Sequence, residues 1–164
     1  MNKEKWTTEN ISNQRGKVII VTGATSGLGK QASKILSEKE ATVVMGVRNI
    51  DKAEEVKKEF LEFNPKASID ILKLELGSLA SIKEFAKVFL SKYDRLDVLI
   101  NNAGIMMCPY SKTSDGFEIQ MGTNHFGPFA LTGLLMPILR KTQGARIVST
   151  SSLAHLGGNI NFND

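Results

Sequence analysis

The sequence predicts an α/β protein built on a doubly wound parallel sheet, with helices on both faces in three layers. Three observations predict this fold. Short β-branched runs alternate with segments of helical periodicity along the chain. The first run, Lys17–Thr22, is almost continuously apolar, as expected of a strand that is buried on both faces. Glycines follow that run directly, and such alternation favours parallel strands joined by right-handed crossovers.

Five apolar runs account for the strands of the predicted sheet. Each is rich in valine, isoleucine or leucine, and a helical segment or a loop separates it from the next run. The runs are residues 17–22, 42–47, 69–76, 96–100 and 145–150.

Apolar residues at helical spacing predict the first three helices. Their stripes are Leu28, Ala32, Ile35 and Leu36; then Ala53, Val56, Phe60 and Phe63; then Leu79, Ile82, Phe85 or Ala86, and Phe89. Asp51 with Glu54, and Ser81 with Glu84, have the spacing of a capping box, so the second and third helices are expected to begin near them.

A long helix is predicted over residues 117–141, with a bend near Gly127-Pro128 because proline removes a backbone donor. Residues 119–139 carry no charge, but they contain polar residues, glycines and two prolines. A membrane span should be more uniformly apolar, so this segment is interpreted as a buried helix.

Length and composition predict one soluble domain. We expect residues 1–16 to form a loosely attached arm and residues 17–164 to form the folded unit. The composition, 41% hydrophobic and 23% charged, is that of a globular protein, and the net charge of +4 is too scattered to predict a nucleic-acid partner. The single cysteine, Cys108, and the polar N-terminus without an apolar signal segment suit a cytoplasmic location.

The glycines after the first strand predict a ligand site. Gly23, Gly27 and Gly29 form the pattern G-x-x-x-G-x-G between a strand and a helix. Glycine permits a tight turn and close approach of the backbone to a ligand, and the helix N-terminus offers unpaired N–H groups to an anion. The pattern therefore predicts a site for the pyrophosphate of a dinucleotide, with a tight turn that binds no ligand as the alternative.

The end of the second strand indicates which dinucleotide is bound. A carboxylate there would accept hydrogen bonds from a ribose 2′-hydroxyl and favour NAD. The sequence instead places Arg48 at this point, and a guanidinium can pair with the 2′-phosphate of NADP. NADP is therefore expected rather than NAD, unless Arg48 is an ordinary surface residue.

Four motifs in sequence order resemble those of the short-chain dehydrogenase/reductase family: TGATSGLG (22–29), NNAG (101–104), GTNHFG (122–127) and RIVSTSS (146–152). The runs HFGPFALTGLL and SSLAH are most similar to its retinol-dehydrogenase-like branch. The resemblance begins at Gly16 and covers the first half of the family's domain. It implies a Rossmann fold, hydride transfer between NADP(H) and a small-molecule alcohol or carbonyl substrate, and frequent homo-oligomers.

The resemblance also implies which residues bind the cofactor. Glu75 stands where the family usually has an aspartate near the adenine. The implied cofactor residues are Gly23, Ser26, Gly27, Leu28, Gly29, Arg48, Glu75, Leu76, Asn101, Asn102, Ala103 and Gly104.

Two catalytic residues follow from the same resemblance. Asn124 matches the family's asparagine, which bends the long helix and holds a water in a proton relay, and Ser152 matches the serine that hydrogen-bonds the substrate oxygen. From the residues alone, Asn124 could equally be a satisfied buried amide, and Ser152 a loop residue at a strand end. His125 and His155 are interpreted as structural, and no spacing near them predicts a metal site.

The family's general acid/base, a tyrosine in Tyr-x-x-x-Lys, has no match in the sequence. The residue four positions after Tyr93 is Asp97, and the one four positions after Tyr110 is Ser114. Lys112 follows Tyr110 too closely for a helical pair. We therefore expect a truncated form of a longer enzyme, with the sheet ending after its fifth strand and with negligible activity of its own.

Two other functions stay open at this point. One is a non-catalytic dinucleotide-binding module, and the other is an interaction protein that pairs through the open edge of the fifth strand. Tight NADPH binding without turnover would favour the first. A folded protein that binds no nucleotide would favour the second.

Overall fold

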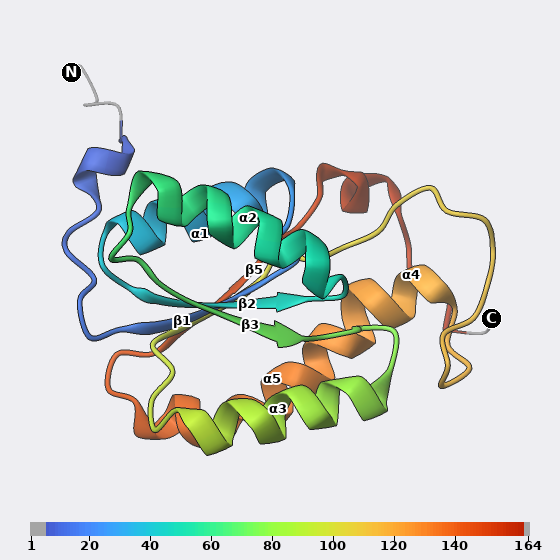
Figure 1. Cartoon of the computed structure of the whole chain (residues 1–164). Coiled ribbons are helices and arrows are strands. Elements are labelled where there is room, and N and C mark those ends of the chain that lie inside the picture. The colour runs from blue at the N-terminus through green and yellow to red at the C-terminus, as the bar shows by residue number, and fades with distance from the viewer. Residues whose placement is uncertain (1–5, 163–164) are drawn as a thin grey trace, which may run out of the picture.

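The structure, a computed structural model, describes residues 6–162 and confirms the predicted fold (Figure 1). Among these residues, five strands form one parallel sheet in the order β3-β2-β1-β4-β5. The order reverses at β1, so the carboxyl ends of β1 and β4 frame the crevice in which sheets of this kind bind ligands. In chain order the strands are β1 (Val18–Thr22), β2 (Thr42–Val47), β3 (Ser68–Lys73), β4 (Val98–Asn101) and β5 (Arg146–Ser149).

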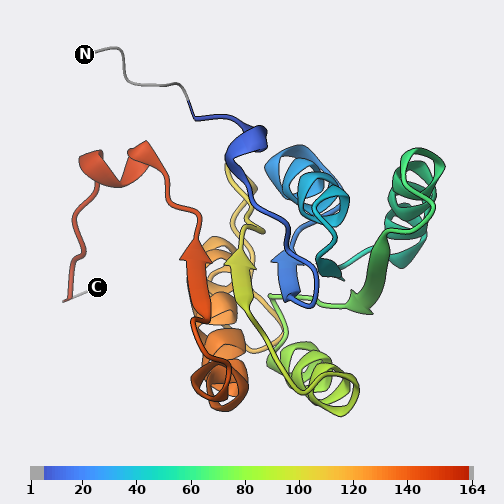
Figure 2. The ribbon, with the colours of Figure 1, turned by 90° about the vertical axis from the view of Figure 1, so that its left-hand side faces the viewer.

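Helices cover both faces of the sheet. Figure 2 shows α1 and α2 on one face and α3 and α5 on the other. The helices are α1 (Gly27–Glu38), α2 (Ile50–Phe63), α3 (Leu79–Lys92), α4 (Ile119–Met121) and α5 (Gly127–Lys141), with short helical turns η1 (Thr8–Asn10), η2 (Gly122–Phe126) and η3 (Leu153–Gly157). These layers are the three that the alternation of strands and helices predicts.

Alternate residues of each central strand supply the two halves of the core. Successive side chains of a strand point to opposite faces, so Ile19 packs in one cluster with Phe60 of α2. Its neighbour Ile20 packs in the other, with Phe89 of α3 and Leu135 of α5. All five residues of β1 are buried, which explains why this strand reads as an almost continuous apolar run.

Two helices begin earlier than the capping pattern predicts. The N-cap of α2 is Asn49, whose side chain accepts a hydrogen bond from the N–H of Lys52 at 2.9 Å. The N-cap of α3 is Ser78, which accepts from the N–H of Ser81 at 3.3 Å. The prediction that Asp51 and Ser81 mark the helix starts was wrong, because asparagine and serine two or three residues earlier are themselves strong caps.

Two residues assigned to apolar helix faces lie on the surface. Leu28 is 75% exposed at the start of α1, where it lines a cavity beside the sheet. The buried side of α1 instead contains small residues, Gly29, Ser33 and Ser37, which suits close packing on the strands. Phe63 is also exposed, and the ammonium of Lys34 lies 4.7 Å from the centre of its ring.

The long helix is present but interrupted. It begins at Ile119 rather than at residue 117, and a π-helical turn, η2, separates α4 from α5. The N–H of Gly127 donates to the carbonyl of Gly122, five residues back. The irregularity therefore lies before Pro128, which sits in the first turn of α5, where a missing N–H is tolerated.

The residues before β1 are tied to the chain just after α1. The N–H of Gln14 donates to the carbonyl of Lys39 at 2.7 Å, and Arg15 pairs with Glu40 at 2.8 Å. The division into an arm of residues 1–16 and a domain of residues 17–164 stays a prediction, and residues 1–5 and 163–164 lie outside the described part.

Candidate cofactor cleft and active site

Two cavities lie side by side at the carboxyl ends of the strands. The first, here called the Arg48 cavity, has a volume of about 650 Å³. The second, the Ser152 cavity, has about 830 Å³. The loop after β4 forms a wall of both, because Asn102, Ala103 and Gly104 line each of them. Because they share part of their lining, the two cavities are together called the cleft.

The glycine turn between β1 and α1 has the shape of an anion cradle. Gly27 has φ of +52°, in the left-handed region, and a Cβ added there would meet no atom within 4 Å. A Cβ on Gly29 would lie 2.4 Å from the carbonyl oxygen of Gly23. The N-cap of α1, Ser26, makes no side-chain capping bond, so the first N–H groups of the helix have no cap from it. These features fit the pyrophosphate of a dinucleotide.

Thr22 joins the ends of β1 and β4, and the sequence analysis missed it. Its hydroxyl oxygen accepts hydrogen bonds from the N–H groups of Asn102 and Ala103, both at 3.0 Å. The side-chain amide of Asn102 donates to the carbonyl of Thr22, also at 3.0 Å. Asn102 therefore fixes the two loops to each other. The signal was present, because Thr22 opens the glycine motif.

The Arg48 cavity is electropositive at one end. Among the described residues that line it, the charged side chains are Arg48, Lys52 and Glu75, two cations and one anion. Arg48 is exposed at the end of β2, and its Nε lies 3.7 Å from Oε2 of Glu75. Lys52 was not predicted, although its place in the first turn of α2, three residues after the cap Asn49, could have indicated it. This end suits a phosphate group.

The Ser152 cavity carries no charged Asp, Glu, Lys or Arg among its described lining residues, which suits an uncharged reacting group. Asn124 lines it from the π-helical turn. Its Oδ1 accepts from the N–H of Ile105 at 2.8 Å, and its Nδ2 donates to the carbonyl of Ile105 at 2.8 Å. The side chain of Asn124 thus holds the loop after β4 rather than standing free in the cavity.

Ser152 lines the same cavity. It is exposed, and its Oγ accepts from the N–H of Ala154 at 3.2 Å as the cap of the turn η3. The hydroxyl hydrogen keeps its freedom to donate to a substrate oxygen. Ser149, Thr150 and Ser151 line the cavity as well, so the end of β5 and the residues after it contribute four hydroxyl-bearing side chains to its lining.

Asn101, at the end of β4, has an unsatisfied buried atom. Its Nδ2 donates to Oγ1 of Thr132 at 3.1 Å, whereas its Oδ1 has no partner among the described residues. Both residues belong to the lining of the Ser152 cavity. A buried acceptor without a protein partner is a feature of functional sites, where a ligand or an ordered water donates the missing hydrogen bond.

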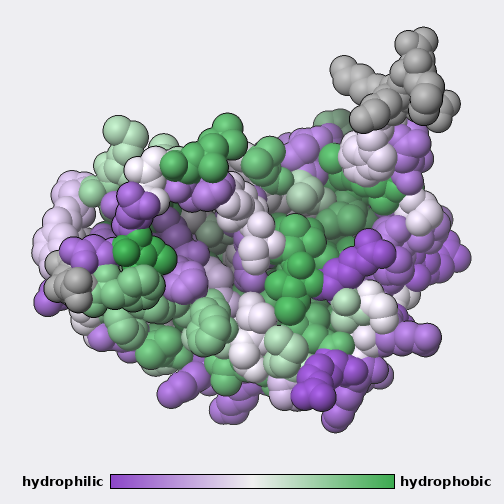
Figure 3. Space-filling view, turned by 180° about the vertical axis from the view of Figure 1, so that it is seen from behind, coloured by the Kyte–Doolittle hydropathy of each residue, from purple (hydrophilic) through white to green (hydrophobic). Residues whose placement is uncertain are grey.

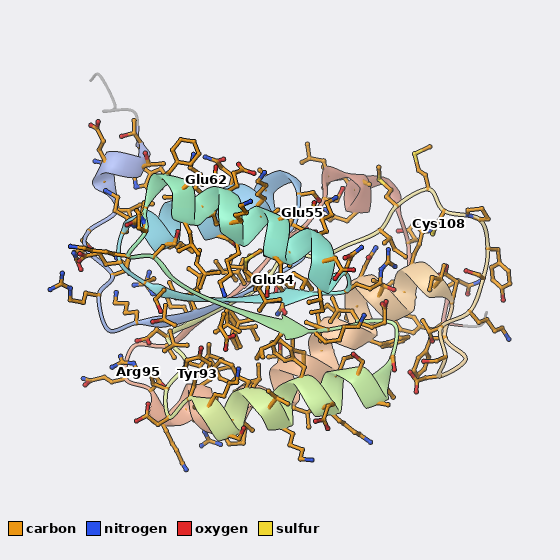
Figure 4. All side chains as sticks on the ribbon, in the orientation of Figure 1. Glu54, Glu55, Glu62, Tyr93, Arg95 and Cys108 are labelled. Carbon is orange, nitrogen blue, oxygen red and sulfur yellow. The ribbon has the colours of Figure 1, made fainter. Side chains whose placement is uncertain are left out.

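Neither tyrosine takes part in this cleft. Tyr93 lies at the end of α3, on the side of the sheet opposite the strand carboxyl ends (Figure 4), and its hydroxyl donates to Asp70 at 3.2 Å. Burial and the charge of Asp70 raise the pKa of Tyr93 to about 12, the reverse of what a general base needs. Tyr110 is exposed in the loop after β4, close to the partly buried Cys108.

Most of the predicted site residues line these two cavities, and the assignment of their roles stays a prediction. Gly27 and Gly29 shape the turn without lining either cavity, and His125 lines the Ser152 cavity although it was interpreted as structural. The Arg48 cavity includes Gly23, Ser26, Leu28, Arg48, Glu75, Leu76, Asn102, Ala103 and Gly104. The Ser152 cavity includes Asn101, Asn102, Ala103, Gly104, Asn124 and Ser152.

The described residues contain no group of three or more His, Cys, Asp or Glu side chains placed to hold a metal ion. None of the helices in residues 6–162 has the length and apolar character that crossing a membrane requires.

Known proteins share both the sequence and the fold. A family model described as short chain dehydrogenase matches residues 17–163. Human retinol dehydrogenase 11 is 48% identical over 149 residues, which cover 91% of this chain and 47% of that protein. Human retinol dehydrogenase 13 is 42% identical over 149 residues, covering 91% of this chain and 45% of that protein. The chain spans about half the length of these curated relatives.

Solved structures of similar fold point to the same family. An uncharacterized protein from Mycobacterium paratuberculosis matches with a TM-score of 0.83 and 40% identity, over 97% of this chain and 55% of that one. A short chain dehydrogenase from Escherichia coli CFT073, solved as a complex with NADPH, gives a TM-score of 0.77 and 28% identity, over 92% and 64%. This chain belongs to the short-chain dehydrogenase family of oxidoreductases, on its retinol-dehydrogenase-like branch.

Proposed function

We propose that the protein is an NADP-dependent oxidoreductase that transfers hydride between the cofactor and an alcohol or carbonyl substrate. The observation that carries this proposal is the electropositive end of the Arg48 cavity, beside a glycine turn shaped for a pyrophosphate. A carboxylate at the end of β2 would have favoured NAD, and Arg48 stands there instead. The NADPH complex of the related Escherichia coli enzyme supports the same cofactor.

Each part of the cleft has a task in this function. The turn at Gly27 would bind the pyrophosphate, and Arg48 would pair with the 2′-phosphate through charge-assisted hydrogen bonds. Bound there, NADP(H) supplies the hydride acceptor or donor. Asn102 and Thr22 hold the loop that separates the two cavities. The Ser152 cavity would receive the reacting ends of cofactor and substrate.

The residues of the Ser152 cavity act on the substrate oxygen. Ser152 donates a hydrogen bond to it, which stabilises the negative charge that develops when a carbonyl accepts hydride. Asn124 positions the loop at Ile105 and so the wall against which the substrate lies. The accompanying proton comes from a group other than Tyr93 and Tyr110, since both lie outside this cavity.

We further propose a cytoplasmic location, in keeping with one unpaired cysteine.

A turnover assay on the full-length gene product tests this function. NADPH is supplied with a panel of aldehydes and ketones, and NADP with the matching alcohols, while nicotinamide absorbance is followed. We expect NADPH-dependent turnover, and a loss in kcat of roughly 10²–10³ for Ser152→Ala because one hydrogen-bond donor to the developing oxyanion is removed.

Ser111→Ala is the matched control, because Ser111 is exposed and lines neither cavity. Its kcat should stay within about two-fold of the unsubstituted protein, in the range of ordinary surface changes. Equal activity of the Ser152→Ala protein and the control would contradict the role of Ser152. NADPH binding without any turnover across the panel would favour a non-catalytic binding module.

A further inference from the structure

Glu75 is fixed by several hydrogen bonds, although its side chain is partly exposed. Its backbone N–H donates to Oγ of Ser81 at 2.9 Å, and its carbonyl accepts from the N–H of Ser78 at 3.1 Å. One carboxylate oxygen, Oε1, accepts from the N–H of Gly77 at 3.2 Å. The turn between β3 and α3 therefore fixes both the main chain and the head group of Glu75.

The second carboxylate oxygen of Glu75 faces Arg48. Oε2 lies 3.7 Å from Nε of Arg48, so the pair uses the inner nitrogen of the guanidinium. The two terminal nitrogens can still bind a phosphate in a bidentate geometry, which is one of those the arginine fork allows. The main chain at Arg48 is fixed as well, because its carbonyl accepts from Nζ of Lys73 at 2.5 Å.

We infer that Glu75 is a positioning residue that orients Arg48 toward the 2′-phosphate and so strengthens the preference for NADPH over NADH. This inference rests on the proposed cofactor and adds the residue that sets its selectivity. The side chain of Arg48 is 75% exposed, so without a partner it would sample many rotamers and lose entropy on binding. A carboxylate anchored at Gly77 restricts those rotamers before the cofactor arrives.

The side chain of Glu75 is long enough to contact both Gly77 and Arg48 at once. An aspartate is shorter by one methylene, so a carboxylate that stays on the N–H of Gly77 would withdraw from Arg48. The pair is partly exposed, with 34% of the Glu75 side chain accessible, so its own attraction is small and its effect is chiefly geometric. The same exposure screens the repulsion between Glu75 and a nearby phosphate.

Two other roles for Glu75 predict different outcomes. If the carboxylate mainly repels the 2′-phosphate, its removal should tighten NADPH binding. If it accepts a hydrogen bond from a ribose 2′-hydroxyl, its removal should weaken NADH binding most. Selectivity between the two cofactors therefore separates a positioning role from both alternatives.

The test compares dissociation constants for NADPH and NADH, measured by titration of the full chain. Glu75→Gln keeps the size and removes the charge, Glu75→Asp keeps the charge and shortens the reach, and Glu55→Gln on the outer side of α2 is the charge-matched control (Figure 4). We expect both changes at Glu75 to weaken NADPH binding by roughly three-fold to ten-fold, the range for one side chain that must be ordered on binding. NADH binding and the control should change by less than about two-fold.

Arg48→Ala completes the test. If Glu75 acts through Arg48, adding Glu75→Gln to Arg48→Ala should leave the NADPH constant unchanged, which a general structural role would not do. Equal or tighter NADPH binding by Glu75→Gln, or equal losses for both cofactors, would overturn the inference and leave the cofactor assignment intact. Failure of the unsubstituted, folded protein to bind either cofactor would overturn both.

Discussion

Arg48 stands at the carboxyl end of β2, where its guanidinium faces the cavity assigned to the adenosine half of the cofactor. With Lys52 it supplies the positive charge of that cavity in the described part of the chain. A 2′-phosphate is the one feature that distinguishes NADPH from NADH. Arg48 should therefore raise the affinity for NADPH and hardly change the affinity for NADH.

Arg48→Ala should weaken NADPH binding by roughly ten-fold to a hundred-fold, since hydrogen bonds to charged groups contribute about 1.5–3 kcal/mol. NADH binding should change little. Fluorescence titration with each cofactor measures both constants. Arg140→Ala, an exposed arginine near the end of α5, serves as the control for loss of one cation. A similar loss for both cofactors would show that Arg48 acts on the fold rather than on the phosphate.

Some positions of single residues in the cleft could be predicted from the sequence, and others could not. The position of Arg48 after the second strand sufficed to predict its place in the cleft. Asn124 was predicted to be a catalytic residue and lines the Ser152 cavity. Its partner, the backbone of Ile105, could not be predicted, because it lies 19 residues away and depends on how the loop folds back. Leu28 was assigned both to an apolar helix stripe and to the cofactor site, and it lies on the surface in the lining of the Arg48 cavity. Helical spacing reports periodicity and not which neighbour a helix turn meets.

The glycine turn is the element that shapes the cleft, and its two glycines are needed for different reasons. At Gly29 there is no space, since a Cβ would also lie 2.5 Å from Nδ2 of Asn102. At Gly27 there is space, but the backbone has φ of +52° and the open region is where a pyrophosphate would lie.

Alanine at these positions should therefore give different outcomes. Gly29→Ala should cost about 1–3 kcal/mol in the free energy of unfolding, as overpacking does, and should also displace Asn102. Gly27→Ala should cost about 1–2 kcal/mol for the left-handed conformation and weaken NADPH binding by more than that loss of stability explains. Urea unfolding and cofactor titration of both proteins check this pair. Equal effects on stability and binding at the two positions would contradict the cradle.

Asp97 ties two central strands together from the opposite end of the sheet. It is buried, and its carboxylate accepts from the N–H of Val18 at 2.9 Å and from Nη2 of Arg95 at 2.6 Å. Burial alone would raise the pKa of Asp97, but the hydrogen bonds from Arg95 and Val18 outweigh it, so the pKa is lowered. The folded state therefore binds this proton less readily than the unfolded chain does.

This pKa shift predicts the pH dependence of stability. The contribution of Asp97 should be fully present above its unfolded pKa, about 3.9, and should be lost as the pH falls through its lower folded pKa. Asp97→Ala should destabilise the protein at neutral pH by about 1–3 kcal/mol, because the buried N–H of Val18 loses its acceptor. Urea unfolding between neutral and acid pH measures both effects, with the exposed Asp94→Ala as control. A parallel pH profile for the two variants would contradict this account.

Element boundaries were predicted less well than element types. All five strands lie within or beside the predicted runs, but the third ends at Lys73 rather than at residue 76. Leu74, Glu75 and Leu76 have the apolar pattern of a strand, yet they leave the ladder after the N–H of Leu74 donates to the carbonyl of Val47. The end of β2 at Val47 was predicted correctly, but the apolar pattern of residues 69–76 does not show the register in which the third strand pairs with β2, and that register decides where β3 stops.

At the scale of the whole molecule, the strand order creates the site. Residues 22–29, 48, 75 and 101–104 are distant in sequence, and the parallel arrangement brings them to one edge because all five strands run in the same direction. The sequence predicted parallel strands from their alternation with helices. The separation of the cleft into two cavities could not be predicted, since it depends on the hydrogen bonds between Thr22 and the loop after β4.

The edge strand β5 gives the whole molecule an apolar edge. Its four residues are exposed, and Figure 2 shows it at one edge of the sheet. Figure 3, the view from behind, shows apolar surface gathered around the middle of the molecule. Unpaired backbone groups and apolar side chains on an edge strand are a template for association. The 164-residue chain should therefore self-associate as its concentration rises.

Val148→Lys should reduce this association, because a charge on an edge strand opposes pairing with a second chain. Sedimentation velocity over a range of concentrations measures it. Leu90→Lys is the matched control, since Leu90 on α3 is 42% exposed and Val148 is 46% exposed. If both variants associate as the unsubstituted chain does, β5 is not the contact.

The binding of NADP in the cleft is the central claim, and calorimetric titration of the folded chain with NADPH and then with NADH tests it most directly. We predict saturable heat with NADPH and clearly weaker binding of NADH, because Arg48 meets a phosphate in one and a hydroxyl in the other. No heat with either cofactor, on protein that unfolds cooperatively in urea, would contradict the claim.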